Sequence, residues 1–166
     1  MADNLHPFVP GDWEAVNRIY KQGIDTNLAT FQTSCPSYEE WDSAHLSCCR
    51  LVYVLEGRVV GWAALSPVSS RCVYKGVAEL SIYIDETVRG NGIGTQLLNR
   101  IIEESESHGI WTLQSGIIQD NKASILLHLK CGFREVGYRE KIARNAHGEW
   151  KNTVLMERRS TLNFEG

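Results

Sequence analysis

The chain has 166 residues, 43% of them hydrophobic, and a formal net charge of −3 from 17 basic and 20 acidic side chains. This length fits one domain with its own core, so we expect a single domain over residues 1–166 with its core at about 5–160. The two signs of charge are interspersed, without the basic stripe that nucleic-acid binding requires. Neither a bilayer-spanning apolar run nor a signal-peptide core is visible, so we expect a cytoplasmic protein without a membrane partner.

The cysteines form an odd set, and their positions match neither a C-x-x-C pair nor a spacing typical of metal ligands. We therefore expect reduced thiols and no metal site. The residues concerned are Cys35, Cys48, Cys49, Cys72 and Cys131.

The chain opens with a predicted strand and helix. Residues 5–9 indicate a short strand at the edge of a sheet, because Pro7 cannot donate a backbone hydrogen bond. Asp12 is suited to cap a helix that follows it. The apolar face of that helix would carry Trp13, Val16, Ile19, Tyr20 and Ile24.

A second helix and a hairpin come next. Ser37, with Glu40 three residues later, forms the pattern of a capping box. Residues 51–55 and 59–65 are apolar runs separated by the turn Glu56-Gly57, which indicates a β-hairpin.

Residues 78–98 change from strand to helix through a glycine-rich turn. Glu79, Ser81 and Tyr83 alternate with apolar residues, which is the period of a strand. RGNGIG follows at 89–94, and the apolar spacing then changes to that of a helix face, with Ile93, Leu97, Leu98, Ile101 and Ile102.

The last part of the chain adds three strands and one helix. Residues 111–118 indicate a strand, and Asp120 or Asn121 would cap a helix that Gly132 ends. Two further strands, 133–143 and 149–159, are joined by a turn. The order of elements indicates an α/β (α+β) fold with one mixed, mostly antiparallel seven-stranded sheet and helices on both of its faces.

The turn at 89–94 is a predicted phosphate site. Backbone N–H groups and the positive end of the helix dipole converge where a strand runs through glycines into a helix. The dinucleotide fingerprint G-x-G-x-x-G is not met, because Thr95 takes the place of its third glycine, and there is no P-loop. What remains is [RQ]-x-x-G-x-[GA], met by Arg89, Gly92 and Gly94.

This motif, between a strand and an amphipathic helix, resembles the acetyl-CoA pyrophosphate loop of the GNAT family of N-acetyltransferases. The element order also matches the fold of that family over nearly the whole chain. A second block, Asn121-x-x-Ser124 followed by LHLKCGF, is similar to the family's N-x-x-[AS]…LYxKxGF. The resemblance implies acetyl-CoA as cosubstrate. It implies binding by Ile82, Tyr83, Ile84, Arg89, Gly90, Asn91, Gly92, Ile93, Gly94, Thr95, Asn121, Ser124 and Lys130.

One position in the second block has two interpretations. His128 stands where many members carry a tyrosine that returns a proton to the departing CoA thiolate. The same histidine, between Leu127 and Leu129, also fits a hydrogen-bonded structural role.

The phrase AELSIYID resembles the phosphinothricin and methionine sulfone acetyltransferases within the family. Members of that group acetylate the α-amino group of small amino-acid-like compounds, and the resemblance implies a homodimer. It also implies an acceptor site, in which Arg71 would hold a substrate carboxylate. The acceptor residues so implied are Phe31, Arg71, Tyr74 and Lys75.

Acetyl transfer to an amine needs the free base, and Glu79 is the candidate to remove the proton. It lies on the polar face of the predicted central strand, where we expect it to be partly desolvated. Its alternative role is that of a carboxylate hydrogen-bonded to core neighbours. By resemblance, a backbone N–H between Leu80 and Ile82 would stabilise the oxyanion.

The leading hypothesis is therefore an N-acetyltransferase that transfers acetyl directly to a small amino-acid-like acceptor in a ternary complex. Acetylation of a peptide or protein amine is a second hypothesis. A non-catalytic acyl-CoA-binding module is a third.

Overall fold

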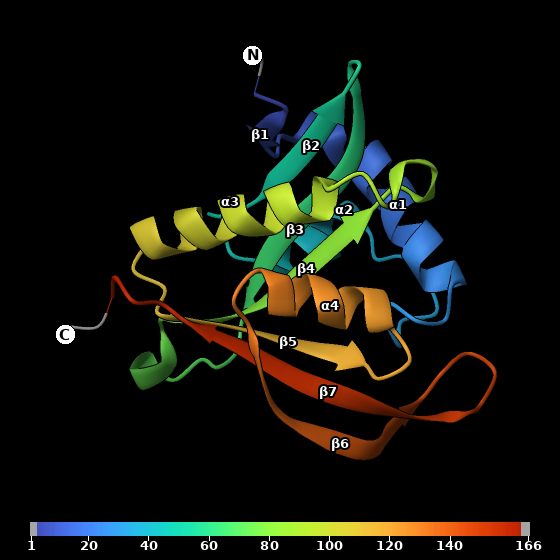
Figure 1. Ribbon diagram of the computed structural model, residues 1–166. Coiled ribbons are helices and arrows are strands. Elements are labelled where there is room, and N and C mark those ends of the chain that lie inside the picture. The colour runs from blue at the N-terminus through green and yellow to red at the C-terminus, as the bar shows by residue number, and fades with distance from the viewer. Residues whose placement is uncertain (1–2, 164–166) are drawn as a thin grey trace.

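The computed structural model describes residues 3–163 (Figure 1). Three short 3₁₀ turns, Pro10–Asp12, Cys72–Tyr74 and Glu86–Val88, connect the main elements. The helices are α1 (Trp13–Asp25), α2 (Tyr38–Ala44), α3 (Ile93–Ser107) and α4 (Lys122–Lys130). The strands are β1 (Leu5–Pro7), β2 (Leu51–Leu55), β3 (Arg58–Pro67), β4 (Val77–Ile84), β5 (Thr112–Ile118), β6 (Arg134–Arg144) and β7 (Trp150–Arg159).

The strands form one seven-stranded sheet in the order β1-β2-β3-β4-β5-β7-β6. β4 and β5 are parallel, and the other neighbouring pairs are antiparallel. This arrangement confirms the predicted mixed, mostly antiparallel sheet. The short β1 lies at one edge, as the proline in it indicated.

Two apolar cores lie on opposite faces of the sheet. α3 and α4 contribute Leu97, Ile101 and Ile125 to the larger core, whereas α1 and α2 contribute Val16, Ile19 and Trp41 to the other. Successive residues of a strand point to opposite faces, so β3 and β4 serve both cores. Figure 1 shows α3 and α4 together on the near side of the sheet.

The predicted helix starts are confirmed in two cases and corrected in one. Ser37 and Glu40 form the reciprocal bonds of a capping box, and the Asn121 side chain accepts from the Ser124 N–H at 3.3 Å. Asp12 precedes α1 but does not cap it through its side chain. Its carboxylate instead accepts from the Val9 N–H at 2.9 Å and closes the preceding 3₁₀ turn.

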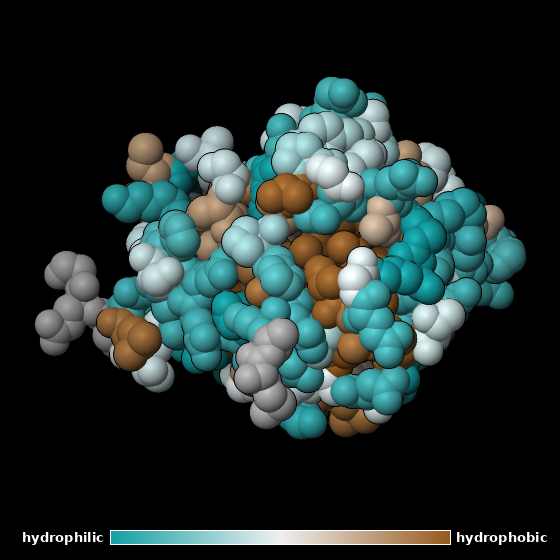
Figure 2. Space-filling model, turned by 90° about the horizontal axis from the view of Figure 1, so that it is seen from above, coloured by the Kyte–Doolittle hydropathy of each residue, from teal (hydrophilic) through white to brown (hydrophobic). Residues whose placement is uncertain are grey.

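Seen from above, the surface is largely hydrophilic, with apolar side chains gathered in one recessed region (Figure 2). Among residues 3–163, none of the helices combines the length and the apolar character needed to traverse a bilayer.

Candidate active site

The two central strands diverge, and this divergence makes the site. β4 pairs with β5 only through Val77, Ala78 and Glu79. Beyond Glu79, β4 continues along β3, while β5 continues along β7 as far as Ile118. A gap therefore opens between two parallel strands in the middle of the sheet, and it leaves the second half of β4 with one backbone edge unpaired by β5.

A pocket of about 450 Å³ lies at this opening. Its walls come from four segments that are distant in sequence: the end of β4, the glycine-rich turn with the start of α3, the start of α4, and the loop after α1. The lining residues include Thr26, Leu28, Ala29, Ile82, Tyr83, Ile84, Arg89, Gly90, Gly92, Ile93, Gly94, Thr95, Asn121, Ser124 and Leu127.

The glycine-rich turn is built to approach an anion closely. Gly90 and Gly92 have φ of +83° and +77°, a region that L side chains rarely adopt, and Gly92 is the N-cap of α3. A Cβ at either glycine would meet no atom within 4 Å, so the space beside the turn is free. The first N–H groups of a helix have no partner within it. These N–H groups and the open turn fit a pyrophosphate.

Arg89 and Asn91 hold the shape of the turn. The Arg89 Nε donates to the Ile84 carbonyl at 3.3 Å, and the Asn91 amide donates to the Val88 carbonyl at 2.9 Å. Arg89 also lines the pocket, so its charge adds to the helix dipole where a phosphate would lie.

The turn is anchored beneath by the buried carboxylate of Asp85. It accepts from Arg58 at 2.8 Å, from the Thr87 N–H at 2.9 Å and from the Thr87 hydroxyl at 2.7 Å, and it pairs with Arg18 of α1. Burial alone would raise the pKa of Asp85, but these donors outweigh it and hold the pKa well below its usual range. The carboxylate is therefore charged at neutral pH and ties α1 and β3 to the turn.

The loop after α1 is held over the pocket from two sides. The Asn121 amide, besides capping α4, donates to the Leu28 carbonyl at 3.3 Å. The Asn27 amide lies 3.1 Å from the His147 Nε2, in the turn between β6 and β7. The β6–β7 hairpin and the start of α4 thus fix this wall.

Comparison with known proteins shows the family to which the chain belongs. Residues 13–133 match the acetyltransferase (GNAT) family. The chain belongs to this family. Its relatives are N-acetyltransferases, and this GNAT protein is one as well.

Two relatives and one structure illustrate the similarity. YwnH of Bacillus subtilis (strain 168), provisionally named a phosphinothricin acetyltransferase, is 38% identical over 132 residues, covering 76% of this chain and 80% of the relative. The phosphinothricin N-acetyltransferase of Alcaligenes faecalis is 30% identical over 154 residues, covering 89% of this chain and 77% of the relative. The phosphinothricin acetyltransferase of Sinorhizobium meliloti, solved with acetyl-CoA, is 27% identical with a TM-score of 0.86, covering 96% of this chain and 89% of that one.

Most of the residues that the GNAT resemblance assigned to acetyl-CoA lie together in the pocket. The exceptions are two. Asn91 supports the turn without lining the cavity, and Lys130 is exposed at the far end of α4.

Glu79 is more open to water than expected. The sequence predicted a partly desolvated carboxylate, whereas the structure exposes this side chain and leaves it outside the pocket lining. The reason is its position at the last paired residue of β4, opposite Gln114, where the strands begin to part. Glu79 thus lies at the entrance to the gap, on the face of β4 that also carries Ser81 and Tyr83.

The contacts of His128 favour its structural interpretation. Its side chain is 2% exposed and packs edge-on against Phe133, with ring centroids 4.9 Å apart. Nδ1 donates to the Ser124 carbonyl at 2.7 Å, so Nε2 accepts from the Ser115 hydroxyl at 3.0 Å. Burial lowers the pKa of His128 and keeps it neutral. Both nitrogens are engaged and the ring lies outside the pocket lining, so of the two interpretations the geometry favours the structural one.

The residues implied for the acceptor lie outside the lining of the described pocket. Arg71, Tyr74 and Lys75 are exposed, and the Arg71 guanidinium lies over the Tyr74 ring, 5.8 Å from its centroid. Phe31 is half-buried, and none of the four lines the described pocket. Their role in holding the acceptor therefore stays a prediction.

The sequence did not predict three parts of the site: Asp85, Gly23 and the loop at 26–29. A Cβ on Gly23 would lie 2.6 Å from the Tyr83 ring, so this helical glycine leaves room for a ring that lines the pocket. A glycine inside an amphipathic helix is the one signal that pointed to such a close approach.

Proposed function

We propose that this protein transfers the acetyl group of acetyl-CoA to the amino group of a small amino-acid-like acceptor, of the phosphinothricin or methionine sulfone and sulfoximine type. The observation that carries the proposal is the pocket in which the opening between β4 and β5 meets the N-terminus of α3. The names of the relatives support the acceptor class.

The cosubstrate would extend along two surfaces of the pocket. Its pyrophosphate would accept from the N–H groups of the turn from Arg89 to Thr95, next to the Arg89 charge. Its pantetheine amides would pair with the edge of β4 at Ile82–Ile84, which β5 leaves free. This direction brings the thioester to the point where the strands part, and we assign the oxyanion donor to a backbone N–H between Leu80 and Ile82.

Glu79 is the proposed base for direct transfer in a ternary complex. An α-amino group has a pKa of about 7.7–8.0, so a carboxylate at the entrance can take its proton directly or through water. The amine lone pair then attacks the thioester carbon, and the C–S bond breaks to release the CoA thiolate. The nitrogen, positively charged after the attack, loses one proton to solvent or to the thiolate. The exposure of Glu79 supports transfer through water.

A second copy of the chain is the proposed partner that completes the acceptor site. The exposed side chains of Arg71, Tyr74 and Lys75 would then contact acceptor and partner together. β6 is a sheet edge with exposed Val136, Tyr138 and Ile142, an apolar surface that a homodimer would cover. Light scattering at several concentrations tests this; a monomer at assay concentration contradicts it.

Acetylation of a peptide or protein amine is the second candidate. The observation in its favour is the open acceptor side, because exposed Glu79 and Arg71 leave room for a longer substrate. One screen separates the two candidates by measuring free CoA released with phosphinothricin, methionine sulfone, methionine sulfoximine, polyamines and short peptides.

We expect release with the amino-acid analogues and little with polyamines or peptides. Release with peptides alone would support the second candidate. Binding of acetyl-CoA without release in any reaction would leave a non-catalytic acyl-CoA-binding module.

A further inference from the structure

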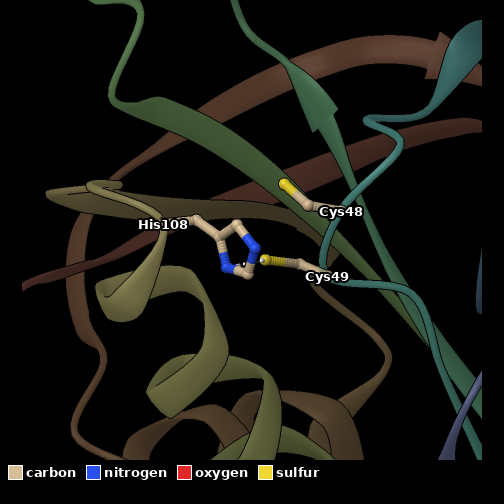
Figure 3. A group of neighbouring side chains, drawn as sticks. All are labelled: Cys48, Cys49 and His108. Atoms are coloured by element: carbon tan, nitrogen blue, oxygen red, sulfur yellow. Dashed lines mark hydrogen bonds between the residues drawn. The ribbon is translucent and has the colours of Figure 1, made fainter.

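A cluster of possible metal ligands lies away from the acetyl-CoA pocket. Cys48, Cys49 and His108 bring two sulfurs and an imidazole nitrogen within 4.8 Å of one another. Figure 3 shows the Cys49 sulfur against the His108 ring, with Cys48 next to it on the same loop. The cysteines precede β2, and His108 is the C-cap of α3, so the cluster joins two elements distant in sequence.

In an extended chain, two adjacent cysteines cannot easily bind the same metal ion, because successive side chains point in opposite directions. Here Cys49 has φ of +59°, which turns the backbone and brings both sulfurs to one side. The loop is held in this shape by Arg50, whose guanidinium donates to the carbonyls of His45 at 3.1 Å and Asp42 at 2.9 Å. The two thiols are thus placed by the protein backbone.

The imidazole lies beside the thiols, with its Nδ1 3.8 Å from the Cys49 sulfur. The His108 Nδ1 lies 2.8 Å from the Glu104 carbonyl, which can only accept, so Nδ1 carries the proton. The lone pair of the neutral ring is then on Nε2. Metal-binding histidines commonly donate their other N–H to a backbone carbonyl in this way, which fixes the tautomer. Binding through Nε2 keeps this bond and requires the Cys49 sulfur, which contacts Nδ1, to shift along the ring.

We propose that Cys48, Cys49 and His108 form a zinc site. Two thiolates and one imidazole are a donor set that favours Zn²⁺ among the common divalent ions. Zn–S bonds of about 2.3 Å and Zn–N bonds of about 2.0–2.1 Å put ligand atoms roughly 3.5–3.8 Å apart in a tetrahedral site. Because the three ligand atoms lie within 4.8 Å of one another, a contraction of at most about 1 Å at any pair reaches that geometry.

The surroundings leave room for a fourth ligand. A cavity of about 270 Å³ is lined by all three residues and by Glu104, one helical turn before His108. A water molecule or the Glu104 carboxylate would complete the coordination. The metal would fasten the loop before β2 to the C-terminal end of α3, the helix whose N-terminal end forms the phosphate site. Its role would be structural, and the two cavities share no lining residue.

The expectation of no metal rested on spacing along the chain. His108 lies 59 residues after Cys49, and a spacing rule for ligands within one short segment cannot detect a ligand from the end of a distant helix.

The test is a titration of the reduced, metal-free full-length protein with Co²⁺ and then Zn²⁺. Co²⁺ serves as the probe because tetrahedral thiolate coordination gives it strong visible bands and a sulfur-to-metal charge-transfer band. We expect one Co²⁺ per chain with these bands, and their disappearance when Zn²⁺ displaces it. Calorimetry with Zn²⁺ alone gives the stoichiometry and affinity.

Cys48→Ser and His108→Asn are the test variants, because both residues are less buried than Cys49 and we expect their substitution to disturb the fold less. Each should weaken Zn²⁺ binding by more than about a hundredfold, since even outer-shell changes cost 10- to 100-fold. Cys72→Ser and His6→Asn, which change exposed residues outside the cluster, are matched controls and should bind as the parent does. Melting curves verify that every variant is folded.

Any of three results would overturn the site: no tetrahedral Co²⁺ spectrum in the parent, equal affinity in Cys48→Ser and His108→Asn, or equal loss in the controls. None of these measurements depends on acetyltransfer.

Discussion

The Arg58 guanidinium, at the beginning of β3, lies 2.8 Å from the carboxylate of Asp85 at the end of β4. Arg18 of α1 reaches the same carboxylate, which is fully buried. The next residues form the turn that would hold the pyrophosphate. Asp85 therefore connects the stability of the sheet to the shape of the cosubstrate site, although it does not line the pocket.

Replacing Asp85 with Asn should destabilise the protein. The substitution removes the charge that two arginines and Thr87 recognise, and hydrogen bonds to a charged group contribute about 1.5–3 kcal/mol each. We expect the free energy of unfolding to fall by roughly 2–4 kcal/mol in urea titrations. Glu86→Gln, at the adjacent exposed acid, is the control and should change it little. An unchanged unfolding midpoint in Asp85→Asn would contradict the anchoring role.

The same carboxylate predicts a pH dependence. The pKa of Asp85 is lower in the folded chain than its unfolded value of about 3.9, so its stabilisation is fully present above that value. It is lost as pH falls through the lower, folded pKa. The difference in unfolding free energy between the parent and Asp85→Asn should be constant from pH 7 to about 5 and shrink below about pH 4. A difference in unfolding free energy that grows as pH falls would contradict the prediction.

Gly92→Glu should abolish cosubstrate binding while the chain remains folded. A Cβ at Gly92 meets no atom within 4 Å, and the glutamate places bulk and negative charge where the pyrophosphate would lie. Gly57→Glu is a matched control, because Gly57 has the same φ of +77°, also has open space, and lies in the β2–β3 turn. Calorimetry with CoA should detect binding in the control and none in Gly92→Glu. Equal affinity in both would remove the turn from the site.

Glu79→Gln retains the shape of the side chain and removes its basicity. If Glu79 is the base, turnover should fall by roughly 10²- to 10⁴-fold with little change in CoA affinity. Glu103→Gln, an exposed acid on α3, should keep parental turnover. Steady-state rates at neutral pH decide the matter, and a fully active Glu79→Gln enzyme would exclude the proposed role.

Arg71→Ala tests recognition of the acceptor. Loss of a bidentate carboxylate contact worth about 1.5–3 kcal/mol should raise the KM for an amino-acid acceptor by roughly ten- to a hundredfold. The amide of the same acceptor, which lacks the carboxylate, should be affected much less. Equal losses on acid and amide would mean that Arg71 does not bind the carboxylate.

Local patterns in the sequence were sufficient to predict the elements, the sheet class and the glycine-rich turn before α3. A strand period that runs into glycines and then into a helix period predicts a strand–turn–helix unit suited to phosphate, because that conformation depends on residues close together in the chain. The Ser37 capping box and the cap at Asn121 are predictable for the same reason. Family resemblance then added the cosubstrate.

Tertiary structure alone decided the burial of single polar residues and the meeting of distant ones. In the sequence, three polar residues look alike, each at the end or on a face of an apolar segment: Glu79, Asp85 and His128. They differ in outcome because the parting of β4 and β5 exposes the first, two arginines from other elements enclose the second, and Ser115 satisfies the third. Cys48, Cys49 and His108 likewise come together only when α3 packs on the sheet. Such contacts depend on how separate elements pack, and a pattern read along one segment contains no information about its partner.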